Sequence, residues 1–291
     1  MHIDSNQLEK FVTQGYLKLK VFEPDDFLSL KQEISDFVDE LADEYFQKGK
    51  VSDLYTQADF TLRMACLMRD CPEIATKFDI EFLLGQKMFQ MMSHPKLLAM
   101  LTDILGDDIT CSGIQHLRIK PPFAMTQAQH AYFNPAWHQD SGVSQPNSDE
   151  SLIVTCWIPL GRASLEMGCL HVHPGVEKHL AHESTGKGTS VVEKHLPKSD
   201  PVVLECEQGE MVFMNQFVPH CSYENLSSES RWSIDLRYQK TGTPSARPWL
   251  PEFVVQSESK PNSVLANYDQ WRLKWQNKPV KPASMQMHRI G

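Results

Sequence analysis

The stretch Ala136-Trp137-His138-Gln139-Asp140-Ser141-Gly142 lies in the middle of a region of short strand-like segments, and this region decides the fold. His138 and Asp140 stand two residues apart. In an extended segment, residues i and i+2 point to the same face, so a short piece of chain can present an imidazole and a carboxylate to one metal ion. Two ligands do not make a tight site, and a third must come from elsewhere in the chain.

The surrounding region, residues 106–245, consists of short apolar or alternating segments separated by Pro, Gly and Asn. Many short strands with turn residues between them are typical of an all-β sandwich or barrel. We expect strands at residues 109–120, 152–159, 169–173, 202–206, 210–214, 220–223 and 231–238. Residues 161–201 include Thr185-Gly186-Lys187-Gly188-Thr189, which predicts a mobile loop and a candidate lid over a site.

Residues 1–105 have a largely helical character instead. Asp4 or Ser5 can cap a first helix that ends at Gly15, and residues 16–22 then alternate as a strand does. A longer helix is expected after Pro24, where apolar residues recur at the helical period, and another at residues 95–105.

Residues 50–92 are ambiguous and are expected to be helical in part. A Pro-rich tail, residues 246–291, ends in a predicted short helix with Trp271 and Trp275 as packing anchors. We therefore expect a single domain over residues 1–291, with a mainly helical N-terminal part, a β core at 106–245 and this tail.

Composition limits the classes of partner. The formal net charge is −9 and the pI about 5.7, which disfavours nucleic acids and anionic membranes. No apolar run approaches the roughly 18 residues that span a bilayer, and the N-terminus has no secretory signal pattern. The seven cysteines are dispersed and lack C-x-x-C spacing, so we expect reduced thiols and a cytoplasmic protein. A small molecule is the expected partner, and the oligomeric state stays open.

His220 is the best candidate for the third ligand, because it opens a predicted strand and Arg231 opens the next one. Two His and one carboxylate on one face of an octahedron form the facial triad of non-haem Fe(II) oxygenases, which leaves three positions open. A bidentate 2-oxo acid can occupy two of them and O2 the third. The far carboxylate of such a cosubstrate suits a planar, bidentate Arg, and Ser222 could add a hydrogen bond.

These residues together resemble the phytanoyl-CoA dioxygenase family of Fe(II)/2-oxoglutarate oxygenases. The resemblance rests on His138-Gln139-Asp140, on Glu166-Met167-Gly168-Cys169-Leu170 leading to Pro174-Gly175, and on His220-x-Ser222…Asn225…Arg231. The interval of eleven residues from His220 to Arg231 and the approach Lys120-Pro121-Pro122 are also similar to the family's. The segment Arg231-Trp232-Ser233-Ile234-Asp235-Leu236-Arg237-Tyr238 resembles a bacterial branch whose substrates are mostly unassigned.

The resemblance implies a fold of β with α: a double-stranded β-helix, the cupin-like jelly roll, with N-terminal helices packed on one sheet. It implies a dioxygenase that hydroxylates a small organic molecule or secondary metabolite and converts 2-oxoglutarate to succinate. Fe(II) would be held by His138, Asp140 and His220, which are the expected catalytic residues. Arg231 and Ser222 would bind 2-oxoglutarate, with Arg118 and Trp157 as further cofactor contacts.

Two alternatives stay open for the whole protein. His171-x-His173, followed by Glu177, partly resembles the metal motif of cupins, which would give a metalloenzyme of the same architecture that needs no 2-oxoglutarate. A catalytically silent binding module on the same fold is the other alternative.

Alternatives also stay open for single residues. Arg237 shares the strand parity of Arg231 and would bind either an anionic substrate group or a nearby carboxylate. We expect His179, His182 and His195 at the surface of the 161–201 segment.

Overall fold

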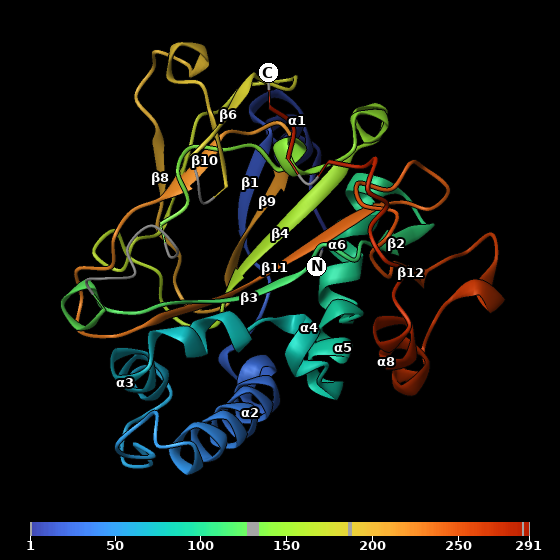
Figure 1. The fold of residues 1–291 in the computed structure, drawn as a ribbon. Helices are drawn as coiled ribbons and strands as arrows, with labels where there is room; N and C mark the ends of the chain where they lie inside the picture. The colour runs from blue at the N-terminus through green and yellow to red at the C-terminus, as the bar shows by residue number, and fades with distance from the viewer. Residues whose placement is uncertain (1, 127–133, 186–187, 287, 291) are drawn as a thin grey trace.

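The structure is a computed structural model that describes residues 2–126, 134–185, 188–286 and 288–290 (Figure 1). Its largest element is a seven-stranded antiparallel sheet in the order β1-β9-β4-β11-β2-β12, with β3 also pairing with β11. The strands are β1 (Tyr16–Lys20), β2 (Ile109–Cys111), β3 (His116–Lys120), β4 (Ile153–Pro159), β9 (Glu210–Asn215), β11 (Arg231–Lys240) and β12 (Phe253–Gln256).

A second, three-stranded sheet has the order β10-β5-β8. Its strands are β10 (His220–Ser222), β5 (Leu170–Val172) and β8 (Val202–Leu204). Leu170 and Val172 of this sheet share a hydrophobic cluster with Trp157 and Met214 of the large sheet, so the two sheets pack face to face. The structure confirms the predicted jelly-roll core.

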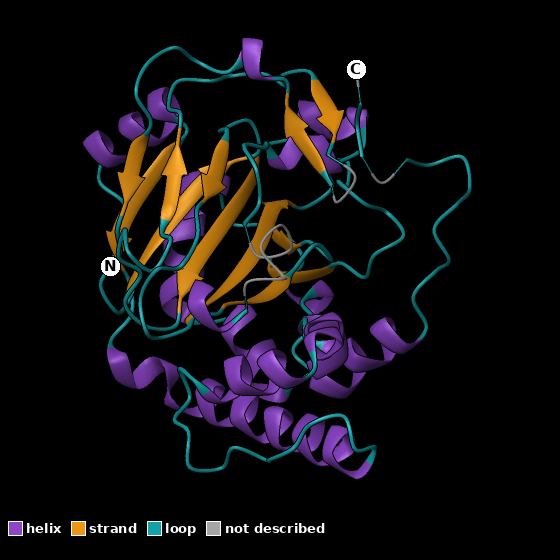
Figure 2. Ribbon diagram, turned by 60° about the vertical axis from the view of Figure 1, so that its left-hand side comes forward, coloured by secondary structure: helices purple, strands orange, loops and turns teal. Residues whose placement is uncertain are grey.

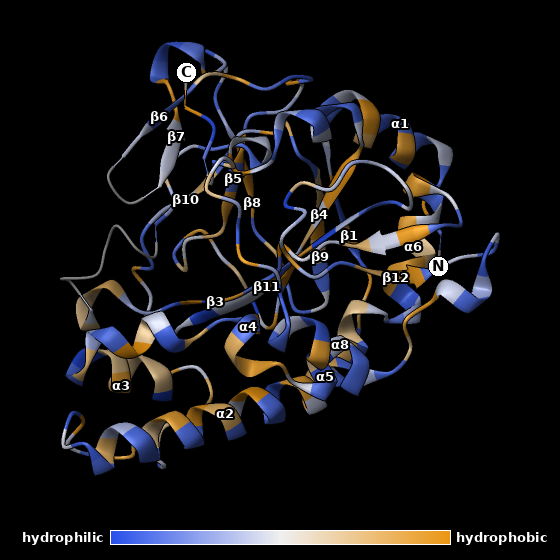
Figure 3. Cartoon of the chain, turned by 45° about the vertical axis from the view of Figure 1, so that its right-hand side comes forward, coloured by the Kyte–Doolittle hydropathy of each residue, from blue (hydrophilic) through white to orange (hydrophobic). Residues whose placement is uncertain are grey.

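Helices cover the other face of the large sheet (Figure 2). They are α2 (Leu28–Gln47), α3 (Arg63–Asp70), α4 (Ile80–Leu83), α5 (Gln86–Met92), α6 (Pro95–Leu105) and α8 (Tyr268–Gln276). Hydrophobic and hydrophilic residues alternate along α2 (Figure 3), and its buried residues join those of the sheet in one core. In this core Trp271 and Trp275 are buried as predicted. Among the described residues, no helix is long and apolar enough to cross a membrane.

Local signals set the helix ends where they were expected. In α1 (Ser5–Gln14), the Asp4 side chain accepts a hydrogen bond from the amide of Gln7 at 2.9 Å. The helix ends at Gly15, whose φ of 78° is left-handed and suits glycine. Helix α6 spans the predicted residues and ends at Gly106.

The segment at residues 109–120, predicted as one strand, forms two strands, β2 and β3. Between them the chain turns, and Gln115 donates a side-chain hydrogen bond to the Ser112 carbonyl at 2.7 Å. Both strands pair with β11, whose ten residues are long enough to accept β3 near one end and β2 near the other.

Two further strand regions were not predicted. A hairpin of β6 (His182–Ser184) and β7 (Thr189–Val191) lies within residues 161–201. Gly186 and Lys187, at the centre of the predicted mobile stretch, lie outside the described residues. In the tail, β12 pairs with β2 and extends the large sheet.

The two faces of strand β11 point to different layers: one toward the helices and the other toward the space between the two sheets. Trp232, Ile234 and Leu236 belong to the core shared with the helices. Arg231, Asp235 and Arg237, on the opposite face, line a cavity. Because both faces are buried, this one strand supplies core packing and polar chemistry together.

Candidate metal centre and cavity

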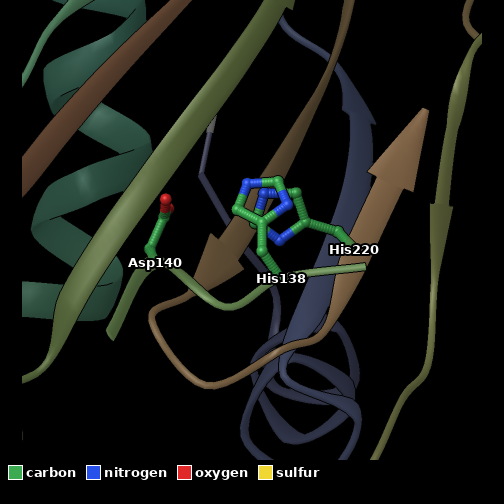
Figure 4. A group of neighbouring side chains, drawn as sticks. All are labelled: His138, Asp140 and His220. Atoms are coloured by element: carbon green, nitrogen blue, oxygen red, sulfur yellow. The ribbon is translucent and has the colours of Figure 1, made fainter. Parts of the chain in front are cut away.

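The metal ligands predicted from the sequence come together. His138 forms an antiparallel bridge with His220 of β10, with N···O distances of 3.0 and 2.9 Å between their main chains. Gln139 is extended (φ −113°, ψ 147°), so Asp140 projects to the same side as His138. Ligand atoms of the three residues lie within 4.8 Å of one another, and Figure 4 shows the two rings side by side near the carboxylate.

Main-chain carbonyls orient both imidazoles for metal binding. Nδ1 of His138 lies 2.8 Å from the Ala136 carbonyl oxygen, and Nδ1 of His220 lies 3.0 Å from that of Val218. Each Nδ1 therefore carries the proton, which leaves the Nε2 lone pair for a metal. Burial, helped by the neighbouring His220, lowers the pKa of His138 to about 3, so that ring is neutral at physiological pH.

The carboxylate of Asp140 is held at both oxygens. Thr155 of β4 donates its hydroxyl to Oδ2, and Nη2 of Arg237 lies 2.5 Å from Oδ1. Burial raises the pKa of Asp140, but the Arg237 charge, the neighbouring His220 and the hydrogen bonds from Arg237 and Thr155 together outweigh it and hold this pKa well below its usual value. Of the two roles considered for Arg237, the structure shows pairing with a carboxylate, and that carboxylate belongs to the group that could hold a metal ion.

The donor set fits Fe(II): two neutral imidazole nitrogens and one carboxylate oxygen, next to an open space. That space is a cavity of about 120 Å³ between the two sheets. Trp157, Leu170 and Met214 provide apolar wall, whereas Arg118, Arg231, Asp235 and Asp79 provide charged groups. An apolar cavity with a few convergent polar groups is the usual form of a small-molecule site.

Arg231 and Ser222 meet at one carbonyl. Nη1 of Arg231 and Oγ of Ser222 donate to the Gly168 oxygen at 2.8 and 3.0 Å. The Arg231 guanidinium also lies 5.1 Å from the ring centroid of Trp157, and its Nε has no partner among the described residues. Burial lowers the pKa of Arg231 to about 10, so the group stays charged at neutral pH.

Gln139 lies between His138 and Asp140 in the sequence, and its hydrogen bonds hold part of the 161–201 segment against the metal motif. Its buried side chain donates to the Lys178 carbonyl at 3.0 Å and accepts from the amide of Leu180 at 2.7 Å. Its own amide donates to Nε2 of His182 at 3.2 Å. The expectation that His182 lies at the surface was wrong, because this contact buries it, whereas His195 is exposed.

The cupin-like motif does not form a second metal cluster. His171 and His173 are buried, each with an Nδ1 that lacks a partner, while Glu177 is exposed. Their rings contact Tyr223 and Trp137 at 4.7 and 4.5 Å between centroids. Across residues 2–126, 134–185, 188–286 and 288–290, the metal-binding group found is the one with His138.

Three polar residues of the site were not predicted from the sequence. Thr155 shares the strand parity of Trp157, and Asp235 that of Arg231, so strand alternation could have identified both. Asp79 lies in the ambiguous region and reaches the cavity only through the packing of its loop on β3. There it accepts hydrogen bonds from the Leu117 amide at 2.8 Å and from His116 at 2.9 Å.

Comparison with known proteins agrees with this geometry. Residues 11–233 match the family described as phytanoyl-CoA dioxygenase (PhyH). A 2-aminoethylphosphonate dioxygenase from uncultured bacterium HF130_AEPn_1 is 24% identical over 240 residues, which cover 82% of each chain.

Solved structures share the fold. The non-haem monooxygenase ThoJ has a TM-score of 0.61 at 15% identity and covers 92% of each chain. CytC3 with Fe(II) and α-ketoglutarate has a TM-score of 0.54 at 14% identity, covering 91% of this chain and 94% of its own. EvdO2 from Micromonospora carbonacea var. aurantiaca, complexed with 2-oxoglutarate, has a TM-score of 0.51 at 18% identity, with coverages of 86% and 97%.

The family match covers most of the chain, and the His-Asp-His group stands where a non-haem iron would be bound. The chain belongs to the phytanoyl-CoA dioxygenase (PhyH) family, and it is an enzyme of the non-haem iron, 2-oxoglutarate-dependent dioxygenase class.

Proposed function

We propose that this dioxygenase hydroxylates a small organic molecule, with His138, Asp140 and His220 as iron ligands and Arg231 with Ser222 as the anchor of 2-oxoglutarate. When bound, Fe(II) with 2-oxoglutarate and O2 supplies the oxidation that yields succinate, CO2 and a hydroxylated substrate. The observation that carries the proposal is the convergence of the three ligands in a cavity that Arg231 and Ser222 also line.

The residues around the ligands support defined tasks. The carbonyls of Ala136 and Val218 keep each imidazole in the tautomer that offers Nε2, and Arg237 with Thr155 keeps the Asp140 carboxylate ionised and oriented. Preorganised ligands of this kind lower the cost of assembling the centre.

The Arg231 end of the cavity suits the C5 carboxylate of 2-oxoglutarate. Arg231 is buried, remains charged and retains an unpaired Nε, so a carboxylate would gain a charge-assisted hydrogen bond there. Trp157 would form the adjacent wall. Arg118, which we also expected to contact the cosubstrate, bonds to Asp235 and not to the Gly168 carbonyl that Arg231 and Ser222 share, so we do not include it in the 2-oxoglutarate anchor.

The enzymes of this family act on small molecules, and we propose a first probe for the substrate of this chain. The relative named for 2-aminoethylphosphonate makes that compound a rational first probe. The seven cysteines are free thiols, which supports our inference of a cytoplasmic location.

The test is Fe(II)- and 2-oxoglutarate-dependent succinate release, measured by mass spectrometry with a pool of small metabolites as substrate. We expect release by the wild type and none by His138→Ala or Asp140→Ala, each of which leaves two ligands. Near-normal turnover in either variant would refute the ligand assignment.

The same assay separates the two alternatives. Metal-dependent oxidation that is not stimulated by 2-oxoglutarate would indicate a cupin-type metalloenzyme. Binding of Fe(II) and 2-oxoglutarate without any consumption of 2-oxoglutarate would indicate a binding module.

A further inference from the structure

Arg118 differs from the other two arginines that line the cavity. Arg231 and Arg237 are each about 5% exposed and their Nη groups bond to Gly168 and Asp140. The Arg118 side chain is 49% exposed and lines the cavity. Its Nε lies 2.6 Å from Oδ2 of Asp235, and its Nη groups make no hydrogen bond to the described residues. Two pairs of N–H donors therefore remain for a ligand.

Arg118 lines the same cavity as His138 and His220. Burial lowers its pKa, but the charges of Asp235, Asp79 and Asp140 outweigh burial and raise this pKa above its ordinary value. A ligand group held by Arg118 would thus lie within reach of an oxidant at the iron.

The fixed charges of the site cancel. Arg118, Arg231 and Arg237 balance Asp79, Asp140 and Asp235. The metal Fe(II) and the dianion 2-oxoglutarate, if both bind as proposed above, balance each other as well.

Three nearby basic residues, His116, Lys120 and Arg247, do not line the cavity. Arg247 stays charged near Asp140 and Arg237, since burial lowers its pKa only to about 10, and its Nε donates to the Val143 carbonyl. Burial lowers the pKa of His116, which keeps this imidazole neutral beside Asp79. Burial and the adjacent Arg231 lower the pKa of Lys120 to about 6, so it too is mostly uncharged. A substrate with net charge would leave one charge without a partner among the side chains that line the cavity, which is costly where those groups are partly buried.

A substrate that carries one charge of each sign avoids this cost. Arg118 offers donors for an anionic group. Asp79, whose side chain is 30% exposed and which also lines the cavity, offers negative charge for a cationic group. Asp235 is less suited to that task, because its charge is already paired with Arg118. Asp79 accepts hydrogen bonds from Ile80, His116 and Leu117 but pairs with no Lys or Arg among the described residues.

We infer that the substrate is a small zwitterion whose carboxylate or sulfonate binds the Nη groups of Arg118 and whose ammonium group faces Asp79. This inference rests on the proposed function, since the charge balance includes Fe(II) and 2-oxoglutarate. It makes Arg118 and Asp79 the residues that determine specificity.

The test is isothermal titration of protein loaded with Ni(II) and 2-oxoglutarate under anaerobic conditions. The probes are taurine and β-alanine, and each is compared with the singly charged analogue that lacks the amine: ethanesulfonate and propionate. We expect at least one zwitterion to bind about 10-fold or more tightly than its analogue, since a hydrogen bond to a charged group is worth about that much.

Three variants assign the binding groups. Arg118→Gln should weaken binding of the zwitterion about 10- to 100-fold. Arg118→Lys, which keeps the charge, should recover part of this affinity. Asp79→Asn should weaken the zwitterion but leave the singly charged anion unchanged. The dissociation constant of 2-oxoglutarate should not change in any of the three.

Several outcomes would overturn the inference. Zwitterions that bind no better than their singly charged analogues, or do not bind at all, would contradict the charge argument. An Arg118→Gln variant that loses 2-oxoglutarate instead would make Arg118 a cosubstrate contact. A wild-type protein that fails to bind 2-oxoglutarate at all would refute the proposed function first, and so the two failures are distinguishable.

Discussion

Thr155 and Arg237 are register partners across strands β4 and β11, and both donate a hydrogen bond to the carboxylate of Asp140. Neighbouring strands place opposite side chains about 5 Å apart, which is close enough for two donors to reach the two oxygens of one carboxylate. The large sheet therefore orients a metal ligand that belongs to the connecting segment before β4 and not to the sheet itself.

Arg237→Leu should lower the affinity for Fe(II) or Ni(II) by about 10- to 100-fold, because it removes the partner that holds Asp140 in place. It should also destabilise the metal-free protein by about 3–5 kcal/mol, because Asp140 is left buried and unpaired. Metal titration and thermal unfolding measure the two effects. Arg162→Gln is the matched control: its side chain is 65% exposed, pairs with Glu207 at 3.5 Å and should affect neither. Unchanged metal affinity in Arg237→Leu would contradict this role.

Arg231→Leu should raise the dissociation constant of 2-oxoglutarate by about 10- to 100-fold, the effect of losing hydrogen bonds between charged groups. Arg231→Lys should lose less affinity for 2-oxoglutarate, because lysine keeps the positive charge, although it lacks the planar pair of donors of a guanidinium. Ser222→Ala should raise the dissociation constant of 2-oxoglutarate by no more than about 10-fold, since it removes one neutral hydrogen-bond donor. Titration with 2-oxoglutarate tests all three while metal binding stays normal. If the affinity of Arg231→Leu is unchanged, Arg118 or Arg237 has the role.

His171→Ala should leave the metal content intact. The residue is buried on β5, contacts Tyr223 and does not belong to the group formed by His138, Asp140 and His220. Its Nδ1 has no partner among the described residues, so the substitution breaks no hydrogen bond there. Metal analysis after reconstitution is the measurement, with His220→Ala as the variant that should lose metal. Loss of iron in His171→Ala would favour the cupin-like site.

Lys120 should make stability depend on pH. Burial and the neighbouring Arg231 lower the pKa of Lys120 to about 6, whereas an unfolded lysine titrates at about 10.4. Between these values the unfolded chain binds more protons, so the free energy of unfolding rises with pH, by at most about 1.4 kcal/mol per pH unit. Below pH 6 the cost of burying the charge is fully present.

Lys120→Met removes this titration. Thermal unfolding of wild type and variant between pH 6.5 and 9 should therefore give a flatter pH profile for the variant, even if it loses the contacts of Lys120 with Asn134 and the Tyr223 carbonyl. Equal slopes for the two proteins would show that Lys120 does not titrate in this range.

Several features of the molecule could be predicted because they depend on neighbours in the chain. Asp4 and Gly15 bound the first helix through hydrogen bonds and a left-handed φ that act within a few residues. The extended Gln139 places His138 and Asp140 on one side, as the i, i+2 spacing predicts.

Other features depend on segments that are distant in sequence, and they could not be predicted. Strand β11 accepts both β2 and β3, which splits the predicted strand 109–120, because pairing is decided by which edges meet. His182 is buried where the amide of Gln139 donates a hydrogen bond to its Nε2, although the two residues are 43 positions apart in the sequence.

The sequence by itself identified the three residues that come together as a candidate metal site, and the arginine that follows His220 by eleven residues and lines the same cavity. The tertiary structure alone decided which groups surround them. Arg237 pairs with Asp140, and Asp79 and Arg118 face the cavity, because strand pairing and burial bring them there. Local spacing is fixed by short-range backbone geometry, whereas these contacts arise only when the whole chain packs and buries its charges in pairs.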